Sequence, residues 1–252
     1  MTVPVTTLWL GPDSPRPVDA PIIEERADAS AWLAALDAHA DDDEGGDGRL
    51  GLHGRVESQL LHGEPVAVVG SDGADGRWAR VVAPWQRSPK DDRGYPGWVP
   101  AAHLAPVGAG SPVDVAAPPV AAGAPTVPVG GDHPAVLLAR QHLGLRYLWC
   151  GISPLGFDCS GLVLHTWRQL GHVIARDAYA QADTAVPVAL EDVRSGDLYF
   201  FARPGRRIHH VGIVVRPGRM VHASETGGVL VEEDLPPERL ATLVAAGRLP
   251  HP

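Results

Sequence analysis

GFDCSGLVLHTWRQLG, residues 156–171, places one cysteine between an aspartate and a serine, directly ahead of an apolar run with helical spacing. The spacing predicts a helix over about 159–170 that ends at Gly171. A thiol at the start of a helix faces unpaired backbone amides and the positive end of the helix dipole. We therefore expect a lowered pKa for Cys159, and a nucleophilic role if a base lies within reach. A buried structural thiol and a metal ligand are the alternatives.

Two histidines on neighbouring strand candidates can supply that base. Residues 206–215, RRIHHVGIVV, contain His209 and His210, and His222 follows in the next apolar run. Side chains alternate between the faces of a strand, so only one of the first two can share a face with His222. We choose His210, because Gly212 lies on the same face and would leave open space beside the imidazole. One histidine would then accept the thiol proton and the other would orient it.

A metal site would use the same three side chains, because Cys159, His210 and His222 could hold zinc and leave one position open. The sequence has no CxxC or HExxH spacing, no phosphate-loop motif and no dinucleotide motif. We expect neither a metal nor an organic cofactor.

Composition excludes several classes of protein. The 252 residues are 44% apolar, enough for a sizeable core, and 21 basic against 30 acidic residues give a net charge of −9. A nucleic acid or an anionic membrane needs a cationic partner, so we expect neither. Two cysteines are too few for a disulfide framework. The first residues lack a basic leader and no apolar run is long enough for a membrane span, which predicts a cytoplasmic protein.

One stretch divides the chain. Residues 107–131 contain five prolines and one charge, Asp114, and this composition is typical of an extended linker. The predicted domains are therefore 1–106 and 132–252, on either side of a Pro/Ala-rich linker over 107–131.

The two parts differ in their predicted elements. Strand patterns around Gly/Asp turns dominate the first part and predict a small all-β barrel with one helical insert, DASAWLAALDAHA, capped by Asp28 or Ser30. The acidic segment after it, residues 41–48, is predicted to be a solvated loop. The second part begins with a helix over about 132–144, capped by Asp132, and continues with the helix at Cys159 and a run of strands. This order predicts an α+β fold with an antiparallel sheet.

The second part resembles a known family. YLWCGISPLGFDCSGLV, residues 147–163, followed by HHVGIVV and VHAS, closely resembles the NlpC-type cell-wall cysteine peptidases, which have a papain-like fold. The resemblance begins at about His133. It implies that Cys159 is the nucleophile, His210 the base, His222 the residue that orients the base, and Tyr147 a contributor to oxyanion stabilisation.

The first part resembles a bacterial SH3-like domain, of the kind fused to γ-D-glutamyl-L-diamino-acid endopeptidases. Residues 6–21, 56–66 and 93–104 carry that resemblance. In this subfamily the SH3-like domain closes one end of the cleft, so that only peptides with a free amino-terminal L-alanine fit. The substrate-contacting positions implied are Glu57, Tyr95, Trp149, Asp158, Ser160, Asp177 and His209.

The residue types agree with that role, because a buried α-ammonium needs carboxylates such as Glu57 and Asp177. Other interpretations remain open: a solvated strand residue for Glu57, core aromatic residues for Tyr95 and Trp149, and helix caps for Asp158 and Ser160.

Two positions depart from the family pattern. Cys150 stands where the family usually has a glycine, and Ala178 stands where the subfamily often has a hydroxyl. The first part also shows one SH3-like unit where some relatives carry two.

The predicted activity is hydrolysis of the γ-D-glutamyl to L-diamino-acid bond in murein peptides with free L-Ala. The product would be L-Ala-γ-D-Glu, in cell-wall peptide recycling. The competing hypothesis is a module that binds cell-wall peptides and has an inactive peptidase-like domain. The sequence decides neither between diaminopimelate and lysine nor the oligomeric state.

Overall fold

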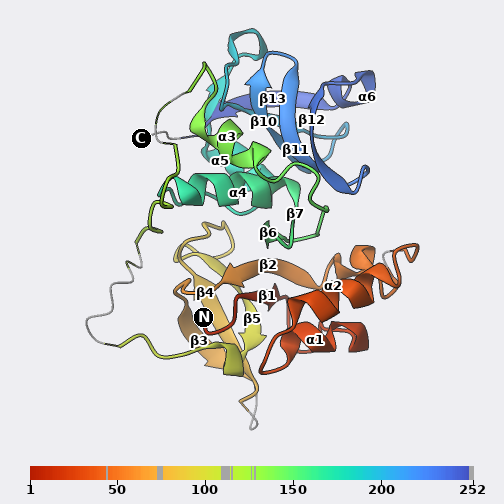
Figure 1. Cartoon of the computed structure of the whole chain (residues 1–252), viewed down its shortest axis with the longest axis vertical. Helices are drawn as coiled ribbons and strands as arrows, with labels where there is room; N and C mark the ends of the chain where they lie inside the picture. Colours follow the sequence, from red (N-terminus) through yellow and green to blue (C-terminus); the bar gives the residue numbers. More distant parts are fainter. Residues whose placement is uncertain are drawn as a thin grey trace. The chain divides into compact units, whose positions relative to one another are not determined.

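A computed structural model describes residues 1–43, 45–72, 76–108, 114, 116–125, 127 and 129–249. The chain forms two compact units (Figure 1). One comprises Met1–Ala116 and Leu148–Leu155, and the other comprises Ala117–Tyr147 and Gly156–Pro252. The chain therefore leaves the second unit after Tyr147 and returns to it at Gly156, three residues before the helix that begins at Cys159. The functional domain boundaries stay a prediction.

The first unit contains a five-stranded antiparallel sheet of order β2-β1-β5-β4-β3. The strands are β1 Val5–Trp9, β2 Val56–Leu61, β3 Ala67–Ser71, β4 Trp78–Ala83 and β5 Tyr95–Pro100, and the short strand β6 is Ile152–Ser153. Within the described ranges no pairing joins β2 to β3. The strands predicted from the sequence are present, but the closed SH3-like barrel is not confirmed and stays a prediction.

A helical insert lies between β1 and β2. It contains α1 Ala20–Ile23 and α2 Ala29–Asp37. Asp28 caps α2 by accepting a hydrogen bond from the Ala31 amide at 2.9 Å, which confirms one of the two predicted caps. Part of the acidic loop predicted after α2 lies outside the described residues, at Glu44.

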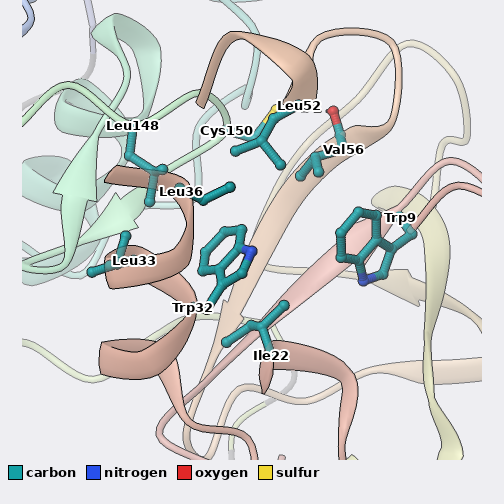
Figure 2. Close-up of a cluster of buried hydrophobic side chains, with 9 residues drawn as sticks. All are labelled: Trp9, Ile22, Trp32, Leu33, Leu36, Leu52, Val56, Leu148 and Cys150. Atoms are coloured by element: carbon teal, nitrogen blue, oxygen red, sulfur yellow. Dashed lines mark hydrogen bonds between the residues drawn. The ribbon is translucent and has the colours of Figure 1, made fainter. Parts of the chain in front are cut away.

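Trp32 of α2 joins the insert to the sheet. Figure 2 shows its indole among Ile22, Leu36 and the other apolar side chains of the first unit's core. Its Nε1 donates to Asp19 Oδ1 at 2.8 Å, and Asp19 in turn binds the Arg16 guanidinium through both carboxylate oxygens. The buried indole nitrogen and the buried charges therefore all have partners, as burial requires.

The segment Leu148–Leu155 is anchored on β2 of the same unit. Cys150 Sγ donates to the Val56 carbonyl at 3.0 Å, and the Ile152 amide donates to Gln59 Oε1 at 3.1 Å. The Gly151 amide bonds to the Leu148 carbonyl, which closes a turn. Cys150 has φ +60°, and it is the sole non-glycine residue with positive φ in the part of the chain that the structure describes.

That backbone conformation explains why a glycine would suit this position. A turn with positive φ only at its third residue is a type II turn, which favours glycine there because a Cβ is crowded. Cys150 is instead held by its burial, since the residue is 5% exposed, and by the hydrogen bond of its thiol.

The predicted linker is partly described. Residues 109–113, 115, 126 and 128 of it lie outside the described residues. In the first unit, Trp85 Nε1 donates to the Asp114 carbonyl at 3.1 Å, and in the second the Ala121 amide donates to the Gln169 carbonyl at 2.9 Å.

The second unit contains a six-stranded antiparallel sheet of order β12-β11-β10-β9-β13-β8. Helices α3, α4 and α5 pack on it at β10, as Figure 1 shows for this unit. The helices are α3 Pro134–Arg140, α4 Cys159–Gln169, α5 Ala178–Thr184 and α6 Pro237–Leu240. The strands are β7 Gly156–Phe157, β8 Val186–Val188, β9 Leu198–Phe201, β10 His210–Arg216, β11 Arg219–Ser224, β12 Val229–Asp234 and β13 Leu243–Arg248.

The mixture of helices with an antiparallel sheet confirms the predicted fold class for the second part. The helix at Cys159 and the three predicted strands after it are present, and Gly171, with φ +85°, follows the helix end.

The predicted cap of α3 is wrong. His133, not Asp132, is the capping residue, and its Nδ1 accepts from the Ala135 amide at 3.1 Å. Pro134 occupies the first helical position, where its missing N–H costs no hydrogen bond, so the cap is the residue before it. Asp132 pairs with Arg140 of the same helix. The helix also ends at Arg140, earlier than the predicted stop at Gly144.

Candidate active site

Cys159 is the first residue of α4, and its neighbours fix the start of the helix. Asp158 accepts a hydrogen bond from the Gly161 amide at 2.6 Å, so its helix-capping role is confirmed. Cys159 is 7% exposed, and its Sγ lies 3.9 Å from the His209 carbonyl oxygen. The sulfur therefore lies beside the first residues of β10.

The two predicted histidines meet on one face of the sheet. His210 Nε2 lies 2.9 Å from His222 Nδ1, and both side chains are buried. In the β10–β11 register Ile213 pairs with Val221, which places Gly212 opposite His222 when continued by one residue. His210 and His222 are therefore diagonal neighbours, which aromatic side chains can bridge.

The expected open space at Gly212 is wrong. A Cβ built there would approach the Met220 sulfur to 2.4 Å and His222 Cβ to 3.2 Å. Met220 fills the volume beside the histidines, so Gly212 permits close packing rather than an opening.

Sequence reasoning missed Glu233 of β12. His222 Nε2 lies 3.0 Å from Glu233 Oε1, and Arg239 Nε lies 3.9 Å from the same oxygen. Both ring nitrogens of His222 are therefore engaged, one with His210 and one with a carboxylate. A glutamate in a row of three acidic residues, 232–234, carries no sequence signal that separates it from a solvated strand edge.

Arg176 is the second residue that sequence reasoning missed. Its guanidinium donates to Asp158 Oδ1 at 3.1 Å, to Asp158 Oδ2 at 2.6 Å and to Ser160 Oγ at 2.9 Å. Its side chain is 1% exposed. Gln181 Nε2 holds the Ser160 carbonyl at 3.0 Å. These bonds fix the residues on both sides of Cys159.

The expected lowering of the Cys159 pKa is wrong. Burial raises the pKa of the thiol to about 12, and the negative charge of Asp158 acts in the same direction. Backbone N–H groups of Val211 and Ser160 and the Arg176 charge oppose this shift but are outweighed. Burial also lowers the pKa of His210 well below 6.5, with His222 and Arg239 contributing. Desolvation of a charged form therefore outweighs the helix N-terminus here.

The resting thiol of Cys159 and the resting imidazole of His210 are consequently both neutral. In a Cys150→Gly protein, which retains Cys159 as its one thiol, we expect the rate of alkylation by iodoacetamide to rise about tenfold per pH unit between about pH 6 and 9. The reason is that the thiolate fraction rises by that factor below the thiol pKa. Intact-mass spectrometry at several pH values measures this rate. A rate that is flat from about pH 5 upward would instead indicate a preformed thiolate–imidazolium pair.

The other predicted site residues of the second unit lie in several elements. His209 is exposed and precedes β10, and Tyr147 is buried, with its amide bonded to the Gly228 carbonyl at 2.8 Å. Asp177 precedes α5, whose first residue is Ala178. Tyr179 lies beneath the Arg207 guanidinium, 3.6 Å from ring centroid to Cζ. The roles of His209, Tyr147 and Asp177 toward a substrate stay predictions.

The predicted site residues of the first unit gather around β2. The carboxylate of Glu57 accepts from the Lys90 ammonium and from the Tyr95 hydroxyl, the latter at 3.0 Å. Lys90 Nζ also lies 3.0 Å from Tyr95 Oη. The Trp149 indole packs on His53, with ring centroids 4.0 Å apart. Sequence reasoning missed Lys90, although it is the single lysine of the chain.

Comparison with known proteins identifies the chain. A family model described as the NlpC/P60 family matches residues 144–238. A Bacillus subtilis protein named gamma-D-glutamyl-L-lysine dipeptidyl-peptidase is 32% identical over 273 aligned positions, covering 88% of this chain and 88% of the relative. The chain belongs to the NlpC/P60 family. It is therefore a cysteine peptidase.

Further relatives agree with an NlpC/P60 assignment. A Bacillus cereus protein of the same name as the Bacillus subtilis relative is 26% identical, over 88% of this chain and 81% of its own length. The crystal structure of an NlpC/P60 family protein from Bacillus cereus has the same fold, with a TM-score of 0.80 over 98% of each chain and 24% identity.

Two negative findings hold for the described part of this NlpC/P60 chain. Within those ranges, no group of three or more His, Cys, Asp or Glu side chains is arranged to hold a metal ion. No helix among the same residues has both the length and the apolar character needed to cross a membrane.

Proposed function

We propose that this NlpC/P60 peptidase hydrolyses the γ-D-glutamyl to L-diamino-acid bond of murein peptides that carry a free amino-terminal L-alanine, and releases L-Ala-γ-D-Glu. The names of the two Bacillus relatives support the choice of the bond that is cleaved, and the sequence resemblance supports the requirement for a free amine. We propose further that the reaction serves recycling of cell-wall peptides in the cytoplasm.

One observation supports the proposed specificity for a free amine. The Lys90 ammonium is held by the Glu57 carboxylate and lies 3.0 Å from the Tyr95 hydroxyl, with Nζ 4.8 Å from the Tyr95 ring centroid. A primary ammonium is therefore bound by Glu57 and Tyr95, two of the first-unit residues that the resemblance implies as substrate-contacting positions. A carboxylate, a hydroxyl and an aromatic ring provide the interactions that an α-ammonium needs.

The chemistry follows from the neutral resting pair. His210 would accept the thiol proton as Cys159 Sγ attacks the γ-glutamyl carbonyl carbon, and the resulting imidazolium would then donate that proton to the leaving amine. The C–N bond breaks and a thioester to the dipeptide remains on Cys159. Water, deprotonated by His210, would hydrolyse this thioester. The Cys159 amide and the Tyr147 hydroxyl are the proposed donors to the oxyanion.

Product analysis tests the proposal directly. Purified protein is incubated with L-Ala-γ-D-Glu-diaminopimelate and with L-Ala-γ-D-Glu-L-Lys, each as the free amine and as the N-acetylated form, and the products are identified by mass spectrometry. We expect L-Ala-γ-D-Glu from the free-amine peptides and a loss of at least about 10²-fold in kcat/KM on acetylation, because Glu57 would lose its charged partner. Equal cleavage of the free and acetylated forms would contradict the proposed specificity for a free amine. Absence of cleavage would contradict the proposed substrate class.

Lys90 leads to a further prediction, because it must leave Glu57 before a substrate amine can bind. Lys90→Met is expected to lower KM for the free-amine peptide by roughly 2- to 5-fold, the value of a partly exposed ion pair of up to about 1 kcal/mol. We expect kcat to stay within a factor of about two, since Lys90 takes no part in the chemistry. Steady-state kinetics measure both constants.

Arg87→Met is the matched control, because Arg87 is an exposed cation on the same connection between β4 and β5. Its KM should equal that of the unmodified protein. A rise of KM in Lys90→Met would show that Lys90 assists binding rather than competes with the substrate.

A further inference from the structure

Three adjacent strands of the second unit contribute to one line of hydrogen bonds. His210 comes from β10, His222 from β11 and Glu233 from β12. His222 pairs with Val231 and Met220 pairs with Glu233, so Glu233 is diagonal to His222 on the same face. The distances are 2.9 Å from His210 Nε2 to His222 Nδ1 and 3.0 Å from His222 Nε2 to Glu233 Oε1.

The sulfur lies beside the strand that carries His210. Cys159 Sγ is 3.9 Å from the His209 carbonyl, and the Val211 N–H is placed to donate to the sulfur. Sγ thus lies beside the backbone on both sides of His210. Because Nε2 of His210 is engaged with His222, Nδ1 is the ring nitrogen left to accept the thiol proton.

Both histidines are neutral near pH 7. Burial is the main reason that the pKa of His222 is lowered, to about 4, and Arg239 acts in the same direction. The pKa of His210 is lowered by burial and by the charges of His222, Arg239 and His209. Glu233 is the acidic side chain that opposes these shifts at His222. A neutral imidazole has one N–H and one acceptor nitrogen, so each ring must adopt one of two tautomers.

The carboxylate selects between those tautomers. A carboxylate has only acceptors, so His222 Nε2 must carry the proton that binds Glu233. His222 Nδ1 is then an acceptor, which requires a proton on His210 Nε2. His210 Nδ1 is left with a lone pair, which is the state that a general base needs.

We propose that Glu233 is a positioning residue of this peptidase, which acts through His222 to hold His210 in the tautomer whose Nδ1 accepts the Cys159 proton. When the proton moves from Sγ to Nδ1, His210 becomes an imidazolium and its Nε2–H remains bonded to His222. The inference depends on the peptidase chemistry of the family and not on the proposed peptide specificity.

The contacts of Glu233 point to this function rather than to stability alone. Its side chain is 38% exposed, while the His222 side chain that it binds is fully buried. Its other described partner, Arg239, is held independently by Ser224 Oγ at 3.2 Å. Loss of the carboxylate therefore leaves Arg239 bound to Ser224. Its main effect is to remove the hydrogen-bond acceptor of His222 Nε2.

Glu233→Gln tests the proposal with little change in shape. Glutamine can donate as well as accept, so it no longer dictates the tautomer. We expect kcat/KM for the preferred peptide to fall by about 10- to 100-fold, the usual effect of removing such a supporting hydrogen bond. Asp234→Asn is the matched control, since Asp234 is the next residue of β12 and its side chain is 63% exposed. The control should stay within a factor of about two.

Two further measurements separate positioning from a structural effect. In a His222→Asn protein, the amide oxygen of the introduced asparagine can accept the hydrogen bond from His210 Nε2 without a carboxylate to fix its orientation. Adding Glu233→Gln to that protein should therefore change kcat/KM less than about twofold. Nitrogen-15 NMR of the histidine rings in Cys159→Ser protein should show the protons on Nε2 of both His210 and His222, and a mixed tautomer population after Glu233→Gln. Unchanged tautomers in Glu233→Gln, or the same loss in both backgrounds, would overturn the proposal. The NMR measurement requires no substrate. It therefore tests the role of Glu233 even if the proposed peptide is not cleaved.

Discussion

Cys159→Ala is expected to lower kcat by at least about 10⁴-fold on any peptide that the protein cleaves, because the covalent intermediate can no longer form. The fold should survive, since the hydrogen bond that the thiol donates to the His209 carbonyl is long, at 3.9 Å, and alanine fits the volume that the thiol leaves. Steady-state kinetics with enzyme concentrations high enough to follow single turnovers measure the loss.

Cys150→Gly is the matched control for that variant. It removes the other thiol at a position where glycine adopts the observed φ of +60° without strain. The lost burial and thiol hydrogen bond act against the relieved strain, so we expect a small net effect on stability and activity within a few-fold of the unmodified protein. If Cys159→Ala kept more than about one per cent of the activity while Cys150→Gly lost it, the assignment of the nucleophile would be wrong.

Arg176→Met is expected to have the largest effect on stability, a loss of about 3–5 kcal/mol in the free energy of unfolding. The Arg176 and Asp158 side chains are 1% and 8% exposed, so the variant leaves a buried carboxylate without its cation. Urea unfolding at 25 °C followed by circular dichroism measures the loss. Activity should also fall, because Asp158 caps the helix whose first residue is Cys159.

A double variant isolates the reason for this loss. Asp158→Asn added to Arg176→Met removes the uncompensated charge and keeps a side chain that can cap α4. The double variant should therefore be more stable than Arg176→Met alone. Arg216→Met is the control, because Arg216 is 59% exposed and its ion pair with Asp234 should contribute less than about 1 kcal/mol. A loss as large in Arg216→Met would contradict the role given to burial.

The sequence predicted those parts of the site that rest on local pattern. A helix that begins at Cys159, strand alternation that separates His209 from His210, and the pairing of His210 with His222 all follow from spacing within one or two elements. The cap of α3 was also open to local reasoning, because Pro134 at the first helical position makes His133 the cap.

Long-range contacts could not be predicted in this way. Arg176 reaches Asp158 across 18 residues of chain, and Glu233 reaches His222 only because β12 pairs with β11 in one register. Nothing in the local composition marks either as buried against the site. The Cys159 pKa was mispredicted for a related reason, since the helix start is visible in the sequence and the desolvation that outweighs it is not.

The most direct test of the account is the covalent intermediate itself. Protein mixed with excess L-Ala-γ-D-Glu-diaminopimelate is quenched in acid within milliseconds to seconds, digested, and analysed by mass spectrometry. We expect a peptide containing Cys159 that carries one L-Ala-γ-D-Glu acyl group, formed and lost at rates consistent with turnover. Turnover without any adduct at Cys159, or an adduct on a different residue, would contradict it.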